Sequence, residues 1–554
     1  MFIGKSVKNI IRKGWIRKMR KSIKRVATTL MAATMVLGAM TSVYADGEEA
    51  TETTEAEDVI EYSLVGSEEL GTNWNVESAD YYMTKVTNNV YKFETTAIAD
   101  VDGEFKIVKD GENEGWNLQF EYGTGAFHDN ASQFKVSAVE GDALTIYANI
   151  ATGEVTLFKN GENATSEVSV NWDSTPEWKE AHPDDEWLSL ADAKTKYAME
   201  GVETTYSVVG TAQLGIDWAP ENPAYIVPGS NGAYTKTMIA SAAGDLEFKI
   251  VEDGEDNAWT MQLQYGVVNG FGDNKSQFKV AAEAGDVFEV TFVPETGDVT
   301  ILKNGAIDAD ALVNWESTDE WKTEHADDEW VSLSAAKEKF VYADAETTYS
   351  VVGTTDLIGL NWEAQDYAYV VPEVDGVYKK VVVAAVDSDA LEFKILQDGP
   401  DSAWANQLQL GVAEFGDNKS QFRVAAQAGD VFEITFTPAN GDVNVKKNGV
   451  DYDYLVRWAT KDEDDQDFLT KAEALAKYVN TSNDDGNTNN DNTANDNTNA
   501  NNTVANNTPS AVTPQTTTQT QQAAKTGDAA PVALLVLLVS AVAVVTVAAK
   551  KKEA

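Results

Sequence analysis

The sequence contains no cysteine, only three histidines, and 42 lysines and arginines against 90 aspartates and glutamates. The lack of cysteine excludes a thiolate nucleophile, a CxxC metal or redox motif and a disulfide framework. The shortage of basic residues makes nucleic acid and other polyanions poor partners. A neutral ligand is compatible with such a surface, although acidic residues also simply keep an exposed protein soluble.

What the sequence does contain is an internal repeat with a spacing of 144 residues. This spacing relates two series of residues, Trp74, Trp218 and Trp362, and Asn130, Asn274 and Asn418. A period of this length corresponds to a domain, because solenoid repeats are about 20–50 residues long. Three tandem copies of one domain favour a binding protein that gains avidity from repetition.

Each copy contains short runs in which apolar and polar residues alternate, such as Glu104-Phe105-Lys106-Ile107 and Leu144-Thr145-Ile146-Tyr147. Such runs predict an all-β sandwich. The last two runs of each copy are joined by a glycine-containing hairpin turn, at Thr152-Gly153, Thr296-Gly297 and Asn440-Gly441. Glycine suits these turns because it adopts positive φ without strain. We predict three β-sandwiches over 60–161, 204–305 and 347–449, a normal size for this architecture.

A tryptophan-rich connector follows each sandwich, over 162–203, 306–346 and 450–479. The connectors contain Trp172, Trp178 and Trp187, then Trp315, Trp321 and Trp330, and finally Trp458 with Phe468. A short helix is predicted at the end of each connector, since Thr470 and Glu473 have the spacing of a capping box and Ser189 with Asp192 is a weaker version. We expect these tryptophans to pack the helix against the sandwich, a carbohydrate platform being the alternative.

The N-terminal segment, 1–45, has the pattern of a secretory signal peptide. It carries ten basic residues and no acidic one, an apolar run from Val26 to Val43, and a small-residue cleavage pattern that ends at Ala45. An acidic leader, 46–59, precedes the first sandwich. The chain is therefore expected outside the cell.

The C-terminal segment predicts an anchor. Residues 480–528 are mostly polar and are expected to form a disordered spacer. The apolar stretch 529–549 is long enough to span a bilayer core of about 30 Å, and the basic tail 550–554 follows it. With Lys525-Thr526-Gly527-Asp528, this arrangement resembles the sorting signal of Gram-positive wall-anchored proteins, although Ala523-Ala524 stands in place of the usual Leu-Pro. Attachment to the membrane or to the cell wall both remain open.

No catalytic or metal-binding constellation recurs in the three copies. His128 is replaced by Gly272 and Gly416, while His182 and His325 lie in connectors and have no counterpart in the third copy. A histidine-dependent triad or acid–base pair in every repeat is thereby excluded. Acid clusters such as Asp184-Asp185-Glu186 lack EF-hand spacing. A glycosidase pair of carboxylates would need a deep cleft that a small sandwich rarely provides. We expect no enzyme activity, no metal and no cofactor.

Aromatic and amide side chains remain in every copy, and they have the chemistry of a neutral-sugar site. A pyranose ring stacks its apolar face on indole, and its hydroxyls pair with amides and carboxylates. The alternatives are that the tryptophans belong to the core and that the Asp-Asn pairs only shape a turn. The predicted carbohydrate-binding residues are Trp74, Trp116, Gln119, Asn130, Trp218, Trp259, Gln262, Asp273, Asn274, Trp362, Trp404, Gln407, Asp417 and Asn418.

One copy resembles the immunoglobulin-like starch-binding modules of bacterial amylases and pullulanases, and of starch-binding proteins on gut bacteria. The resemblance covers about 100 residues of each copy and is carried by Val208-Val209-Gly210, Gly215-Ile216-Asp217-Trp218, Leu246-Glu247-Phe248-Lys249-Ile250, Trp259, Gln264-Tyr265-Gly266, Gly272-Asp273-Asn274 and Gly285-Asp286-Val287. It implies an immunoglobulin-like fold, α-glucan binding and no catalysis. The first copy departs at His128, Ala131 and Phe120-Glu121, and the third at Leu410.

Together these features predict a monomeric, multivalent surface protein that binds a neutral polysaccharide, most readily starch or another α-glucan. The competing hypothesis is a structural or adhesive surface protein, whose sandwiches act as spacers or bind a host protein. Burial of every repeated tryptophan would favour the competing hypothesis, because spacers have no need of exposed indoles.

Overall fold

The computed structural model describes residues 61–459 and 467–479. These residues form three consecutive domains of mostly β structure with closely similar topology, which confirms the predicted tandem all-β architecture. The predicted signal peptide, acidic leader, spacer, apolar anchor and basic tail lie outside the described residues. Among the helices that the structure does describe, none is long and apolar enough to cross a membrane.

Each domain contains a larger antiparallel sheet of seven strands, in which one long strand pairs with the first strand of the domain and with two others. In the first domain these strands are β1 (Tyr62–Gly66), β4 (Val101–Lys109), β5 (Gln119–Phe120), β6 (Phe127–His128), β7 (Gln133–Ala138), β11 (Ser169–Asn171) and β12 (Leu188–Ser189). In the second they are β13 (Tyr206–Gly210), β16 (Gly244–Glu252), β17 (Gln262–Leu263), β18 (Phe271–Gly272), β19 (Gln277–Ala282), β23 (Leu312–Asn314) and β24 (Val331–Ser332). In the third they are β25 (Tyr349–Gly353), β29 (Ser388–Gln397), β30 (Gln407–Leu408), β31 (Phe415–Gly416), β32 (Gln421–Ala426), β36 (Leu455–Arg457) and β37 (Leu469–Thr470).

The smaller sheet has five strands in the first two domains and six in the third. In the first domain it contains β2 (Thr84–Lys85), β3 (Val90–Thr96), β8 (Ala143–Asn149), β9 (Val155–Lys159) and β10 (Glu162–Asn163). In the second it contains β14 (Gly229–Ser230), β15 (Ala233–Ile239), β20 (Val287–Val293), β21 (Asp298–Lys303) and β22 (Ala306–Ile307). In the third it contains β26 (Leu357–Ile358), β27 (Glu373–Val374), β28 (Val377–Ala384), β33 (Val431–Thr437), β34 (Asp442–Lys447) and β35 (Val450–Asp451).

The two sheets of each domain enclose one hydrophobic core. In the first domain, Phe105 and Phe134 of the larger sheet and Ile146 and Leu157 of the smaller one belong to the same buried cluster. Along β7, buried residues alternate with more exposed ones, as the period-2 pattern of the sequence predicts. The second and third domains have equivalent cores. This packing of apolar faces is the main stabilising contribution within each repeat.

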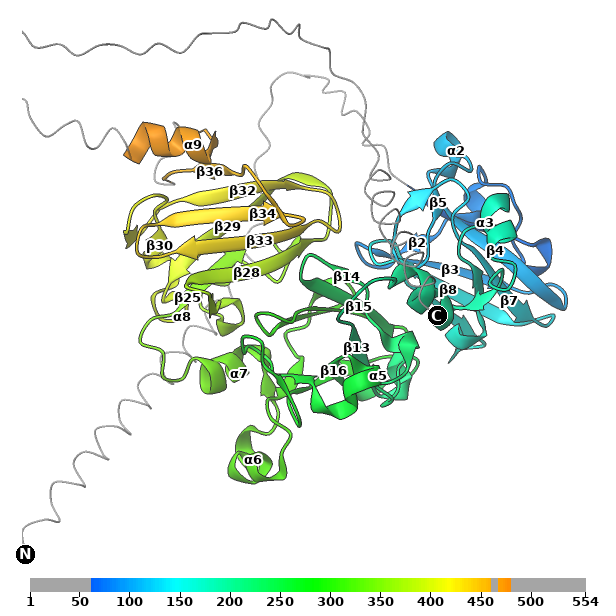
Figure 1. The fold of residues 1–554 in the computed structure, drawn as a ribbon, viewed down its shortest axis with the longest axis horizontal. Coiled ribbons are helices and arrows are strands. Elements are labelled where there is room, and N and C mark those ends of the chain that lie inside the picture. Colours follow the sequence, from blue (N-terminus) through cyan, green and yellow to red (C-terminus); the bar gives the residue numbers. More distant parts are fainter. Residues whose placement is uncertain (1–60, 460–466, 480–554) are drawn as a thin grey trace, which may run out of the picture. The chain divides into compact units, whose positions relative to one another are not determined.

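Each connector adds two short strands to the larger sheet of its own repeat. β11 pairs with β7 and β12 pairs with β11, and the same pairings recur in the next two copies. The helices of the described residues are all short: α2 (Gly111–Glu114), α3 (Pro176–Ala181), α4 (Leu190–Ala193), α5 (Gly254–Asn257), α6 (Asp319–Glu324), α7 (Leu333–Ala336), α8 (Gly399–Ser402) and α9 (Lys471–Ala474). In the third repeat, drawn in yellow and orange, α9 lies next to β36 (Figure 1).

The connector tryptophans have the packing role expected from the sequence. The indole N–H of Trp315 donates to the Tyr265 carbonyl at 3.0 Å, and its ring stacks on Phe340 beyond α7. Trp172 and Trp458 make the same backbone hydrogen bond and stack on Tyr197 and Tyr478. The capping box of Thr470 with Glu473 is also confirmed. The connectors are therefore fastened to the domains that precede them.

The predicted glycine hairpins connect β8 to β9, β20 to β21 and β33 to β34. Gly297 has φ of +70°, and a Cβ built on it would lie 2.6 Å from the Val267 nitrogen. The hairpin therefore packs its backbone directly against the loop that follows Tyr265. Gly285 also has positive φ, +90°, but a Cβ on it would meet no atom within 4 Å.

Substitution of these two glycines by alanine distinguishes backbone strain from steric conflict. Gly285→Ala is expected to lower the free energy of unfolding by about 1–2 kcal/mol, the cost of positive φ for a residue with a Cβ. Gly297→Ala should lower it by more than about 3 kcal/mol, because overpacking is added to the same strain. Urea unfolding followed by tryptophan fluorescence measures both. Equal losses in the two variants would contradict the close packing of the hairpin.

Candidate functional site

Two tryptophans in each repeat form a partly exposed pair on the surface. The ring centroids of Trp74 and Trp116 lie 6.1 Å apart with an angle of 42° between the ring planes. The second and third repeats have the same distance, with angles of 39° and 40°. The pairs are Trp74 with Trp116, Trp218 with Trp259, and Trp362 with Trp404. The structure thus brings together the two predicted tryptophan series, which are 41 or 42 residues apart in the sequence.

The tryptophans are too exposed to be core residues. Trp74, Trp218 and Trp362 expose 41%, 42% and 37% of their surface, and Trp116 exposes 38%. Trp259 and Trp404 are half-buried, and Trp404 rests on a small cluster that includes Tyr369 and Leu396. Each pair therefore presents an apolar, angled surface to solvent on an otherwise acidic protein.

Backbone hydrogen bonds fix the loop that carries the first tryptophan of each pair. In the second repeat, a 3-10 turn ends at Gly215, whose φ of +76° closes the turn. The Gly210 amide at the end of β13 then donates to the carbonyl of Asp217, directly before Trp218, at 3.0 Å. The first and third repeats have the equivalent bond to Asn73 and Asn361. The exposed indole thus projects from a loop anchored to the larger sheet.

The second tryptophan is supported from below by a glutamine. Gln262 is 3% exposed, and its Nε2 donates to the Trp259 carbonyl at 2.5 Å. Gln119 and Gln407 make the same bond to the carbonyls of Trp116 and Trp404. This burial places the three glutamines behind the tryptophans and not on their exposed faces. They are positioned to hold the tryptophan loop, which differs from the direct sugar contact expected of them.

The Asp-Asn pairs form a turn at the start of the next long strand. Asn130, Asn274 and Asn418 all have positive φ, between 55° and 57°. The Asn274 carbonyl accepts a bond from the amide of Ser317 in the connector at 2.8 Å, and Asn130 is bonded in the same way to Ser174. Asn274 and its neighbour Asp273 are exposed, as is Asp417, so their side chains remain accessible to a ligand. The turn-forming role and a binding role are compatible here.

In the second and third repeats a buried lysine, which no sequence pattern singles out, connects the glutamine to the Asp-Asn turn. Lys249 Nζ donates to Gln262 Oε1 and to the Lys275 carbonyl, both at 2.7 Å. Lys394 makes the equivalent bonds to Gln407 and to the Lys419 carbonyl. Burial lowers the pKa of both lysines to about 8. The lysine thus links the tryptophan loop to the turn through hydrogen bonds.

The first repeat lacks part of this support. Lys106 donates to the Ala131 carbonyl and to Ser174, but Gln119 Oε1 has no hydrogen-bond partner. Its Nε2 instead also lies 3.4 Å from Asp129. His128, at the position of Gly272, contacts Glu121. The first repeat therefore has the same tryptophan geometry, but the residues behind its tryptophan pair make fewer hydrogen bonds with one another.

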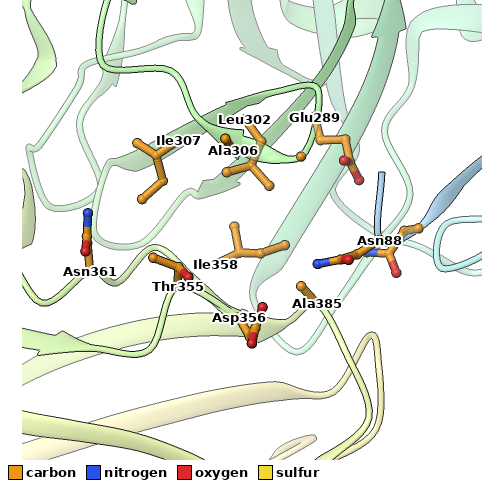
Figure 2. Close-up of a pocket in the computed structure, with 12 residues that line it drawn as sticks. Asn88, Glu289, Leu302, Ala306, Ile307, Thr355, Asp356, Ile358, Asn361 and Ala385 are labelled. Atoms are coloured by element: carbon orange, nitrogen blue, oxygen red, sulfur yellow. The ribbon is translucent and has the colours of Figure 1, made fainter. Parts of the chain in front are cut away.

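The tryptophan pairs do not line the cavity drawn in Figure 2. A cavity of about 310 Å³, shown in Figure 2, is lined by apolar residues such as Leu302 and Ile358 and by the buried Glu289. Burial raises the pKa of the Glu289 carboxyl, which the Thr87 side chain hydrogen-bonds. None of the predicted carbohydrate-binding residues lines this cavity. Open tryptophan surfaces suit an extended polymer better than a small enclosed ligand.

Comparison with known proteins assigns no family to the chain. No protein-family model matches it, and no curated protein matches its sequence. Within the ranges 61–459 and 467–479, no group of three or more histidine, aspartate or glutamate residues has the arrangement of a metal site. A functional assignment therefore depends on the geometry of the tryptophan pairs.

The lowered pKa of Lys249 predicts a stability that rises with pH. Between its folded pKa of about 8 and its ordinary value of 10.5, the folded state binds fewer protons than the unfolded state. Raising the pH from 7.5 to 9.5 should therefore raise the urea midpoint of unfolding, and Lys249→Met should reduce that rise. Lys303→Met is the control, because Asp286 raises the pKa of Lys303 and its contribution is unchanged in this window. The same rise in the parent chain and in both variants would contradict the burial of the Lys249 ammonium group.

Proposed function

We propose that the three repeats are non-catalytic binding modules for a neutral polysaccharide, with starch or another α-glucan as the ligand. The observation that carries the proposal is the solvent-exposed tryptophan pair, which recurs three times at 6.1 Å with nearly the same angle. Indole faces bind the apolar faces of sugar rings. In the second and third copies the Asp-Asn turn is tied to the same buried lysine as the glutamine behind the pair, and in every copy the turn can supply polar groups for hydroxyls.

The angle between the rings favours an α-glucan. Successive glucose faces along an α-1,4-linked chain turn relative to one another, whereas those of cellulose stay close to one plane. Two indoles inclined by about 40° fit a turning chain better than a flat one. The resemblance to immunoglobulin-like starch-binding modules supports the same ligand and extends the proposal to that fold.

Placement at the cell surface completes the proposal. The signal-peptide pattern at the N-terminus and the apolar stretch with a basic tail at the C-terminus support export followed by attachment to the membrane or wall. There, a monomer with three modules would retain polysaccharide outside the cell. A structural or adhesive role is the competing function. Repeated exposed indoles weigh against a simple spacer.

Retention by glucan gels tests the proposal directly. The purified chain should be retarded by amylopectin, pullulan or glycogen embedded in a native gel, and much less by xylan or soluble cellulose derivatives. No reducing sugar should appear on prolonged incubation. Unretarded migration in all three α-glucans would refute the proposed ligand, and sugar release at enzymatic rates would refute the absence of catalysis.

Substitution separates the surface tryptophans from the packing ones. Trp218→Ala with Trp259→Ala should abolish binding by the second repeat while changing the free energy of unfolding by about 1 kcal/mol or less per exposed site. Trp315→Ala should cost about 3 kcal/mol or more, because this ring packs against the core and bonds the Tyr265 carbonyl. Calorimetric titration with a maltooligosaccharide and urea unfolding give the two quantities. The number of maltooligosaccharide sites per chain should fall by one, and an unchanged number in the folded variant would contradict the role of this tryptophan pair.

Avidity is expected from the three copies. A single shallow sugar site commonly has a Kd of about 0.1–1 mM, equivalent to about −4 to −5.5 kcal/mol. Linked sites can raise the apparent affinity for a repeating polymer by about 10²–10⁴. Removing the tryptophan pairs of the second and third repeats should therefore weaken binding to starch granules far more than threefold. An unchanged granule affinity would mean that the first repeat alone binds.

A further inference from the structure

Two lysines and one acid meet at the junction between the first and second repeats. Glu154 Oε1 of the first repeat accepts from Lys236 of the second at 2.5 Å, and lies 3.4 Å from Lys194 of the connector. Glu154 Oε2 accepts the Thr237 amide at 3.1 Å. Lys194 also donates to the Ile226 carbonyl of the second repeat at 3.1 Å. Both repeats and the connector thus share one polar cluster.

The junction between the second and third repeats has the same cluster. Asp298 of the second repeat pairs with Lys337 of the connector at 2.6 Å and with Lys380 of the third repeat at 3.0 Å. Lys337 donates to the Val370 carbonyl at 2.9 Å, as Lys194 does to Ile226. We call each set, Glu154 with Lys194 and Lys236, and Asp298 with Lys337 and Lys380, a junction triad.

The junction triads are buried among apolar contacts that also cross the junctions. The acids are 7% exposed on their side chains, and the lysines expose between 1% and 10%. Val90 and Phe158 of the first repeat share a cluster with Ile239 and Val287 of the second. Ala233 and Val293 of the second share one with Val381 and Val431 of the third. All these residues belong to the same compact unit of the chain.

Both lysines of the junction triad are replaced where a repeat has no neighbour. The first repeat has Phe93 at the position of Lys236 and Lys380, since these residues pair with Ile146, Val290 and Ile434 at the 144-residue spacing. After the third repeat, Leu475 begins the turn that Lys194 and Lys337 begin in the other copies. Phe93 and Leu475 both pack against the core of their own repeat.

The first repeat therefore folds without the strand lysine and the third without the connector lysine, and each lysine of the junction triads coincides with an adjoining repeat. A buried cation is costly unless an acid and carbonyls compensate it, so its position in the fold requires a specific reason. An apolar residue of similar size serves the same position at both ends of the array. After the third repeat the equivalent acid, Asp442, is paired with Lys471 of the same repeat at 2.8 Å, so an ion pair that crosses from one repeat to the next is found only at the two internal junctions of the described residues.

We infer that the junction triads lock successive repeats into one fixed orientation, so that the three tryptophan pairs are presented as a single rigid array. Lys194 and Lys337 bond groups on both sides of their junctions, and Lys236 and Lys380 bond the acid of the preceding repeat. These bonds form only when the two repeats meet in one register. Phe93 and Leu475 are the apolar residues that stand at the lysine positions on the outer faces of the first and third repeats. Rigid presentation of three sites would lower the entropy lost when one polymer occupies them, a consequence that rests on the proposed function.

The absence of cysteine allows the lock to be tested in the whole chain. Glu140→Cys with Ala284→Cys places two spin labels at equivalent exposed positions across the first junction. Pulsed electron spin resonance should give one narrow distance distribution. Lys236→Phe with Lys194→Leu, which install the residues of the natural ends, should leave circular dichroism unchanged and broaden the distribution about twofold or more.

Lys196→Gln is the matched control, because it removes an exposed ion pair with Asp185 from the same helical turn without crossing the junction. Its distribution should remain narrow. Glu154→Gln is a second variant that removes the acid and should broaden the distribution while conserving side-chain size. A broad distribution in the parent chain, or a narrow one in both junction variants, would overturn the lock. These readouts need no ligand, so they are independent of whether the repeats bind glucan.

Discussion

The alternation of side chains along one long strand of each larger sheet determines both the core and the site. In β16, Phe248 and Ile250 are fully buried in the core between the sheets, and Lys249 between them points to the opposite face. There Lys249 reaches the glutamine behind Trp259 and the turn at Asn274. A register shift of one residue would move the lysine into the core and the aromatic ring into the site. Core packing therefore also positions the tryptophan pair.

Features that depend on only a few neighbouring residues were predictable from the sequence. Alternating runs, glycine turns and the capping box at Thr470 follow from backbone geometry over a few residues, and the structure agrees at each. The pairing of Trp218 with Trp259 could not be derived in this way, since two loops from different parts of the sheet must meet. The short connector strands were also missed, because two or three residues such as Val331–Ser332 have no measurable period.

The structure separates the roles of the predicted site residues more finely than the sequence could. Amide side chains suit both hydroxyl recognition and backbone support, and sequence alone does not separate the two. Burial does, since Gln262 bonds the Trp259 carbonyl from below while Asp273 stays exposed. The supporting role of Lys249 is not predictable from the sequence, because an alternating Glu-Phe-Lys run is usual for any half-buried strand. Its role depends on acceptors distant in the sequence, Gln262 Oε1 and the Lys275 carbonyl, which only the folded chain brings together.

Repetition also explains why charge is buried at the junctions of so acidic a chain. Two neighbouring acidic domains repel one another, and apolar contact alone would tolerate many orientations. A lysine inserted between an acid of one repeat and carbonyls of the next supplies attraction that depends on geometry. The positions of Phe93 and Leu475 show that this solution is used only where two repeats adjoin. Under the proposed function, ordered repeats would lose less entropy than independently moving ones when one polymer occupies all three sites.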